Sequence, residues 1–95
     1  MELGTLYASL AVKQKMDEDK QFESFVQESV KRHASHDWGN VCDEDQLINN
    51  EALKSGERII SGYLLNETAI WVVTEADRSE TLVLFPEERR TDGKE

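Results

Sequence analysis

Three apolar segments in the last third of the chain constrain its fold more than any other feature. Short polar connections separate the three segments, which cover residues 58–65, 69–76 and 81–85. Their length and spacing predict strands joined by hairpin connections, the first of them through residues 66–68. In the middle segment both alternating sets are apolar, Ile70 with Val72 and Trp71 with Val73. Such a strand has to lie inside a sheet, with helices on one face and the other face covered or paired.

The first two thirds of the chain predict one strand and two or three helices. Alternation within residues 2–10 predicts a short strand at the edge of the sheet. Residues 10–16 are compatible with a short helical turn. From Asp19 to Ala34 apolar residues recur at steps of three and four, which predicts an amphipathic helix. Within it, Glu28 precedes Arg32 by four residues, the favourable order for a helical ion pair.

A second helix is predicted after the glycine-containing connection SHDWGN. Asp43 and Gln46 have the spacing of a capping box, and Gly56 is placed to end the helix. The predicted class is therefore α+β: an N-terminal strand, two to three helices, and a C-terminal three-stranded antiparallel meander packed on the helices. Residues 1–88 form one domain in this interpretation. Residues 89–95 contain no apolar residue and are expected to be a mobile charged tail.

The charge of the chain limits its partners. Asp and Glu number 20 against 11 Lys and Arg, so the net charge is -9. Affinity for phosphates comes from cationic side chains that displace counterions, so we expect no direct binding to nucleic acid or to an anionic membrane. A basic protein surface is a compatible partner. The chain contains one cysteine and no long apolar run, and we expect a cytoplasmic protein.

The stretch from His33 to Asp45 holds two histidines, a tryptophan, the only cysteine and four carboxylates within thirteen residues. A metal site would use His33, His36 and Cys42, but structural zinc sites usually have two closely spaced ligand pairs, and the sequence offers one. His33 also falls on the apolar side of its helix, where we expect a half-buried residue at the helix end. We predict no metal and no cofactor.

Catalysis is a second hypothesis for the same stretch. Cys42 would be the nucleophile, but the three acidic residues that follow it disfavour a thiolate, so we expect a small buried residue at a helix start. Carboxylate pairs for Mg²⁺ are the remaining possibility, and they are Asp43 with Asp45 and Glu75 with Asp77. Residues 37–51 contain no Lys or Arg to hold a substrate phosphate. We therefore predict no catalytic residues and no enzyme.

The two tryptophans and the 74–78 connection suggest structural or binding roles. Trp71 is predicted in the core because its strand is rich in aliphatic residues. Trp38 either pins its turn to the sheet or is an exposed anchor for a partner, and we favour the pin. In the connection, we expect Asp77 to cap the turn and Arg78 to pair with Glu75.

Short motifs are distributed along the chain from Leu3 to Glu88. They are Asp37-Trp38-Gly39, Glu44-Asp45, Asn49 or Asn50, Leu53 with Gly56, Ile70-Trp71, Thr74-Glu75-Ala76-Asp77-Arg78-Ser79 and Leu84-Phe85-Pro86. Together they resemble a small family carried on plasmids, conjugative elements and prophages of bacteria, whose members are described as plasmid-related. The chain departs from that pattern at His36, where a glycine is common, at Asn40, where an acid is common, and after Glu88.

The resemblance implies a context more than a chemistry. Small acidic proteins of mobile elements are often anti-CRISPR or anti-restriction factors, and carboxylates spread over one face can present a field comparable to that of DNA. We therefore expect inhibition of a nucleic-acid-dependent host nuclease, a CRISPR effector or a restriction enzyme, through its basic surface. The expected partner-binding residues are Asp37, Trp38, Asp43, Glu44, Asp45, Glu51, Glu75, Asp77 and Arg78. The alternative is a small regulatory or assembly module that acts through a hydrophobic sheet face, with a homodimer as one form.

Overall fold

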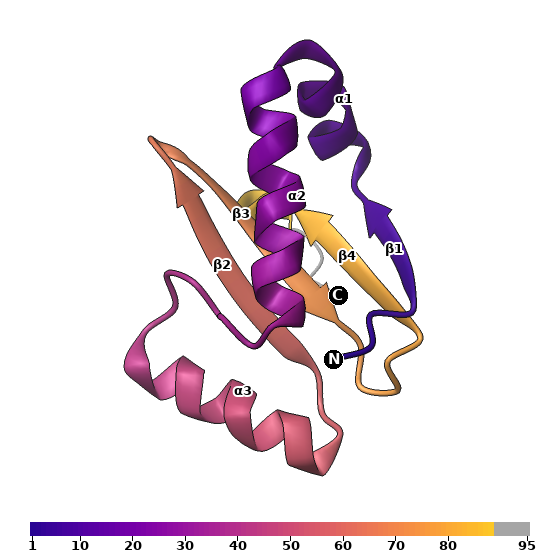
Figure 1. Ribbon diagram of the computed structural model, residues 1–95, viewed down its shortest axis with the longest axis vertical. Coiled ribbons are helices and arrows are strands. Elements are labelled where there is room, and N and C mark those ends of the chain that lie inside the picture. Colours follow the sequence, from indigo (N-terminus) through magenta and orange to yellow (C-terminus); the bar gives the residue numbers. More distant parts are fainter. Residues whose placement is uncertain (89–95) are drawn as a thin grey trace.

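The computed structural model describes residues 1–88 and confirms the α+β class (Figure 1). The elements in chain order are β1 (Thr5–Ala8), α1 (Leu10–Glu18), α2 (Lys20–Ala34), α3 (Asp43–Ser55), β2 (Ile59–Leu65), β3 (Thr68–Thr74) and β4 (Glu80–Leu84). The two strands of the first hairpin are joined by Asn66 and Glu67 alone, one residue fewer than predicted. Residues 89–95, the predicted tail, lie outside the described residues.

The sheet has four strands in the order β1-β4-β3-β2. The antiparallel pairs β2–β3 and β3–β4 form the predicted meander. The N-terminal strand adds to it as an edge strand, as expected, and runs parallel to β4, with Thr5 opposite Glu80. The sheet is thus mixed, and its first and last strands in the sequence are neighbours. The crossover between them takes up α1, α2, α3 and the other two strands.

Helices α1 and α2 cover one face of the sheet (Figure 1). The core on this face joins Val12, Phe22 and Val26 of the helices to Tyr63, Ile70, Val72 and Val83 of the strands. α2 begins as predicted, because the Asp19 carboxylate accepts hydrogen bonds from the backbone N–H groups of Gln21 and Phe22, at 3.0 and 3.2 Å. α1 is a full nine-residue helix where the sequence indicated a short turn, and the Ser9 hydroxyl caps it.

Helix α3 lies beside β2 over a second, smaller cluster (Figure 1). This cluster contains buried Trp38, Ala52 and Ile59. The predicted capping box is absent, because the helix begins at Asp43 and its N-cap is Cys42, which makes no side-chain capping bond. The prediction for the other end is confirmed: Gly56 has a φ of 78° and its N–H donates to the carbonyl of Ala52.

Candidate functional site

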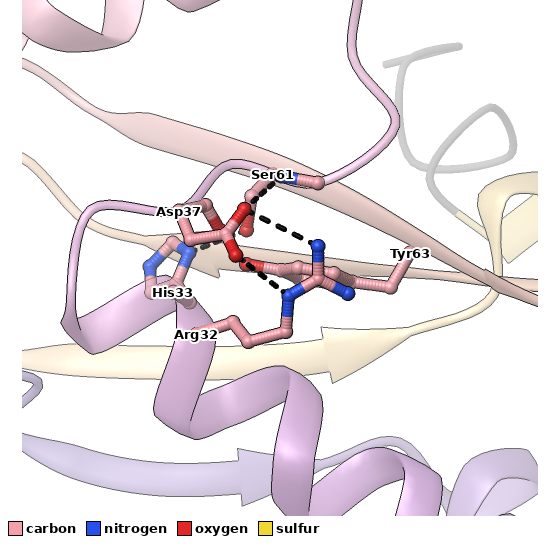
Figure 2. A network of polar contacts seen from close by, with 6 residues as sticks. Arg32, His33, Asp37, Ser61 and Tyr63 are labelled. Atoms are coloured by element: carbon pink, nitrogen blue, oxygen red, sulfur yellow. Dashed lines mark hydrogen bonds and ion pairs between the residues drawn. The ribbon is translucent and has the colours of Figure 1, made fainter.

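A polar cluster holds the connection between α2 and α3 against the sheet (Figure 2). Nε and Nη2 of Arg32 donate to the two carboxylate oxygens of Asp37, at 2.8 and 3.2 Å. The Tyr63 hydroxyl donates to the backbone carbonyl of Asp37 at 2.7 Å, and the Arg32 guanidinium lies over the Tyr63 ring. Arg32 thus pairs with Asp37 and not with Glu28, and its hydrogen bond lowers the pKa of the Asp37 carboxyl. The connection between α2 and α3 places the Asp37 carboxylate next to the Arg32 guanidinium, and Asp37 therefore takes the place of Glu28 as its partner.

His33 lies inside the core, where the sequence predicted a half-buried position. Its Nδ1 contacts the Ser61 hydroxyl at 2.5 Å, and its Nε2 contacts the Thr74 hydroxyl at 2.8 Å. Thr74 contacts the Thr81 hydroxyl, which donates to the carbonyl of Leu3. Each hydroxyl has one proton, so Thr74 donates to Thr81 and accepts from Nε2–H. Nδ1 therefore carries no proton and accepts from Ser61.

The neutral imidazole follows from the same surroundings. Burial is the main cause that lowers the pKa of His33 to about 4, and the charges of His36, Arg78 and the N-terminus act in the same direction. Both ring nitrogens are occupied by hydroxyl groups of the core. His33 is therefore a structural residue, and it is not available to a metal ion or to a substrate in this arrangement.

Trp38 is buried and pins the turn, which confirms the role we favoured for it. Its indole N–H donates to the side chain of Asn50 at 3.0 Å, and its ring contacts both His33 and His36. Gly39 forms a bridge to Gly62, where a Cβ would overlap the Gly62 carbonyl oxygen. Trp38 thus has no surface for a partner.

His36 and Cys42 are the other two residues that a metal site in the stretch from His33 to Asp45 would use. His36 has a φ of 70°, in the left-handed region that favours glycine. Cys42 is exposed, which corrects the expectation of a buried cysteine, because it lines an open cleft between α3 and the strands. Within residues 1–88, no group of three or more His, Cys, Asp and Glu side chains is arranged to hold a metal ion.

The expected acidic residues of α3 form a continuous exposed surface. Asp43, Glu44, Asp45 and Glu51 are all exposed, and none of their side chains has a hydrogen bond or an ion pair with another residue of the range 1–88. Two large apolar side chains lie among them: Leu47 is 66% exposed and Ile48 is 55% exposed. Glu44, Leu47, Ile48 and Glu51 are three or four residues apart, so they share one side of the helix. We call these four residues with Asp43 and Asp45 the α3 surface.

A cleft of about 430 Å³ opens beside the α3 surface. Asp45 and Ile48 of the helix form one wall, and Ile60, Gly62 and Trp71 of the strands form the other. Trp71 is only partly buried, because its side chain lines this open cleft on the face of the sheet away from α1 and α2. The prediction that Trp71 is a core residue was therefore wrong. The cleft is mainly apolar, and one acidic residue, Asp45, and one basic residue, Arg58, line it.

The 74–78 connection lies at the other end of α3. Asp77 accepts from the backbone N–H of Ser79 at 3.0 Å, so the predicted turn cap is confirmed. The Glu75 carboxylate pairs with Arg58 and not with Arg78. Arg78 instead donates to backbone carbonyls, including that of Ala52 at 3.0 Å, because the carbonyls at a helix C-terminus lack partners and carry partial negative charge.

Of the expected partner-binding residues, Asp43, Glu44, Asp45 and Glu51 form one surface. Asp37 and Arg78 instead hold the connections on either side of α3 in place. Leu47 and Ile48 were not among the expected residues, and their only sequence signal was a pair of adjacent apolar residues in an otherwise polar helix.

Comparisons with protein-family models, with curated proteins and with solved structures give no match. No helix within residues 1–88 is long and apolar enough to cross a membrane.

Proposed function

We propose that this protein is a non-enzymatic acidic inhibitor that binds the basic nucleic-acid-binding surface of a nuclease. A CRISPR effector of the host is the first candidate, and a restriction enzyme is the second. The single observation that carries the proposal is the α3 surface, in which unpaired carboxylates surround the exposed Leu47 and Ile48.

The carboxylates and the apolar side chains of the α3 surface have different roles in binding. Carboxylates without internal partners are free to pair with the lysines and arginines of a nucleic-acid-binding groove, and a net charge of -9 steers such an encounter. Rim charges contribute modest affinity, whereas buried apolar anchors at the centre of an interface contribute most of it. Leu47 and Ile48 supply the anchors, and the cleft beside Ile48 supplies space for an apolar side chain of the partner.

The chemistry of the polar groups supports a binding role over catalysis. His33 makes its hydrogen bonds to hydroxyl groups of the core. Asp37 is paired with Arg32, and Arg58, the cation that lines the cleft with Asp45, is paired with Glu75. The resemblance to a family of mobile elements is consistent with an anti-defence role.

The test uses purified nucleases and three variants of the full chain. The acidic variant changes Asp43→Asn, Glu44→Gln and Asp45→Asn. The apolar variant changes Leu47→Ser and Ile48→Ser. A matched control neutralises the same number of exposed acids elsewhere, with Asp17→Asn, Glu18→Gln and Glu28→Gln. DNA cleavage by a panel of CRISPR effectors and restriction enzymes is measured against inhibitor concentration at low and high salt.

We expect stoichiometric inhibition by the native chain and by the control, with at least a tenfold loss for both α3 variants. Added salt should weaken inhibition, because exposed charge pairs are screened. Equal loss in the control and the acidic variant would mean that net charge alone acts, and would contradict a role for the α3 surface. Full activity of both α3 variants would also contradict it.

A second candidate function is a small regulatory or assembly module that acts through the sheet face away from α1 and α2. The observation that favours it is the apolar exposure on that face, where Leu64 is 54% exposed and Trp71 is partly buried. This candidate predicts that partner binding survives high salt and the acidic variant, and that Leu64→Ser abolishes it.

A further inference from the structure

The two edge strands of the sheet, β2 and β1, differ in whether other residues cover their outer backbone groups. At the β2 edge, the Asn49 side chain bonds both the N–H and the carbonyl of Ile60, at 3.3 and 2.8 Å. The backbone of Gly62 bonds to Trp38 and Asn40. These contacts cover the β2 edge for much of its length. Within residues 1–88, no strand lies on the outer side of β1.

The backbone of β1 presents a defined set of groups at its open side. The N–H of Thr5 donates to the carbonyl of Ser79, and the N–H of Ser9 donates to the carbonyl of Val83. The backbone N–H and carbonyl groups of alternate residues from Thr5 onward therefore point toward β4. Backbone direction alternates along a strand, and therefore the N–H and carbonyl groups of Leu6 and Ala8 point away from the sheet. The strand reads Thr-Leu-Tyr-Ala and contains none of the charges or prolines that usually protect an edge.

An apolar groove of about 410 Å³ lies along this open edge, between β1 and α2. Leu6, Ala8 and Val83 line it from the sheet, and Met16, Val26 and Val30 line it from the helices. Leu6 is 51% exposed and Tyr7 is 50% exposed, on opposite faces of the strand. The edge thus offers apolar side chains and backbone groups together.

The distribution of acidic residues favours a second copy of the chain as the partner of this edge. Residues 3–16 contain no Asp or Glu, in a chain whose net charge is -9, and Lys13 is the one charged side chain among the residues that line the groove. Two copies of so acidic a chain repel each other over most of their surfaces. The β1 edge is a surface on which a second copy meets no carboxylate in the strand or the groove.

We propose that β1 pairs with β1 of a second copy, antiparallel and about a twofold axis, so that one sheet continues through both chains. The outward groups of Leu6 and Ala8 set the register: Leu6 exchanges backbone hydrogen bonds with Ala8 of the second copy, and Tyr7 lies opposite Tyr7. Leu6 then projects beside the small Ala8 into the other copy's groove, and the tyrosine rings meet on the opposite face. This proposal does not depend on the function assigned to α3.

The register has a direct chemical test in the full chain. Opposed residues that exchange no backbone bonds have Cα atoms about 4.5 Å apart, within the range that a disulfide spans. In a Cys42→Ser background, Tyr7→Cys should therefore form an intermolecular disulfide under mild oxidation, whereas Leu6→Cys should form at least tenfold less, because each Leu6 lies opposite Ala8. Equal cross-linking at both positions, or none at Tyr7→Cys, would overturn the proposal.

Sedimentation equilibrium provides the second test, on unoxidised protein. The native chain should dimerise with a dissociation constant on the order of 10 µM, because the interface is small. Leu6→Lys should weaken dimerisation at least tenfold, and Leu64→Lys, an equally exposed leucine of β2, should leave it unchanged. Circular dichroism verifies that both variants are folded. A native chain that is monomeric well above that concentration, or a dimer indifferent to Leu6→Lys, would also overturn the proposal.

Discussion

Helices α2 and α3 differ in how many of their side chains are buried against the rest of the protein. α2 buries Phe22, Val26, Ser29 and His33, and the Asp19 carboxylate caps it. α3 buries only Asn49 and Ala52, has no side-chain cap at its N-terminus, and exposes Leu47 and Ile48. A helix with so much unpaired apolar and acidic surface contributes little to folding for its length. α2 therefore contributes most to stability, and the exposed side of α3 is left for the partner binding that we propose.

The largest loss of stability is expected when the buried aromatic side chain of α2 is removed. Phe22 is buried and its ring lies 6.0 Å from that of Phe85. Phe22→Ala should lower the free energy of unfolding by about 3–5 kcal/mol, through lost transfer energy and a cavity. Urea denaturation followed by tryptophan fluorescence measures this change. A loss below about 1 kcal/mol would mean that α2 is not the stabilising helix.

Acid pH should weaken the α2 side through His33. Its pKa is about 4 in the folded chain against an ordinary value of 6.5, so the unfolded chain binds more protons between these values. Stability is therefore fully present above about pH 6.5 and falls by about 3 kcal/mol as pH decreases toward 4. Urea denaturation over this range measures the loss, and NMR of the ring nitrogens should show the Nε2–H tautomer. A His33 ring that titrates near pH 6.5 would contradict the buried network.

A smaller effect concerns the attachment of α3 to the sheet. Asn49→Ala leaves the N–H and carbonyl of Ile60 without their side-chain partners, and should cost about 1–3 kcal/mol. Hydrogen exchange should show faster loss of the Ile60 amide proton in the variant. Glu51→Ala, on the exposed side of the same helix, is the matched control and should leave both measurements unchanged.

The smallest expected change in stability is at the α3 surface. Leu47→Ser with Ile48→Ser should alter the free energy of unfolding by no more than about 0.5 kcal/mol, because more than half of the surface of each residue is already exposed. The same variant should lose inhibition in the nuclease assay. Loss of stability comparable to that of Asn49→Ala would show instead that these residues pack against part of the protein.

Local patterns accounted for the elements, but the contacts between them followed tertiary placement. The three-and-four periodicity from Phe22 to Val30 placed α2, and the apolar segments placed the meander. The Glu28–Arg32 pair failed because the connection brought Asp37 to the same guanidinium. In α3, Leu47, Ile48, Ala52 and Leu53 do not specify one apolar side, so the buried side was not predictable from the pattern alone.

By itself, the sequence determined the class of fold, the position of most elements, the end of α3 at Gly56, and the acidic character of the surface. These properties depend on neighbours within a few residues, or on composition, and both can be read along the chain. Only the tertiary structure decided that β1 joins β4, that His33 is bonded within the core, and that the α3 carboxylates surround an apolar pair. Those outcomes depend on which surfaces meet after folding, because burial and pairing are set by residues distant in the sequence.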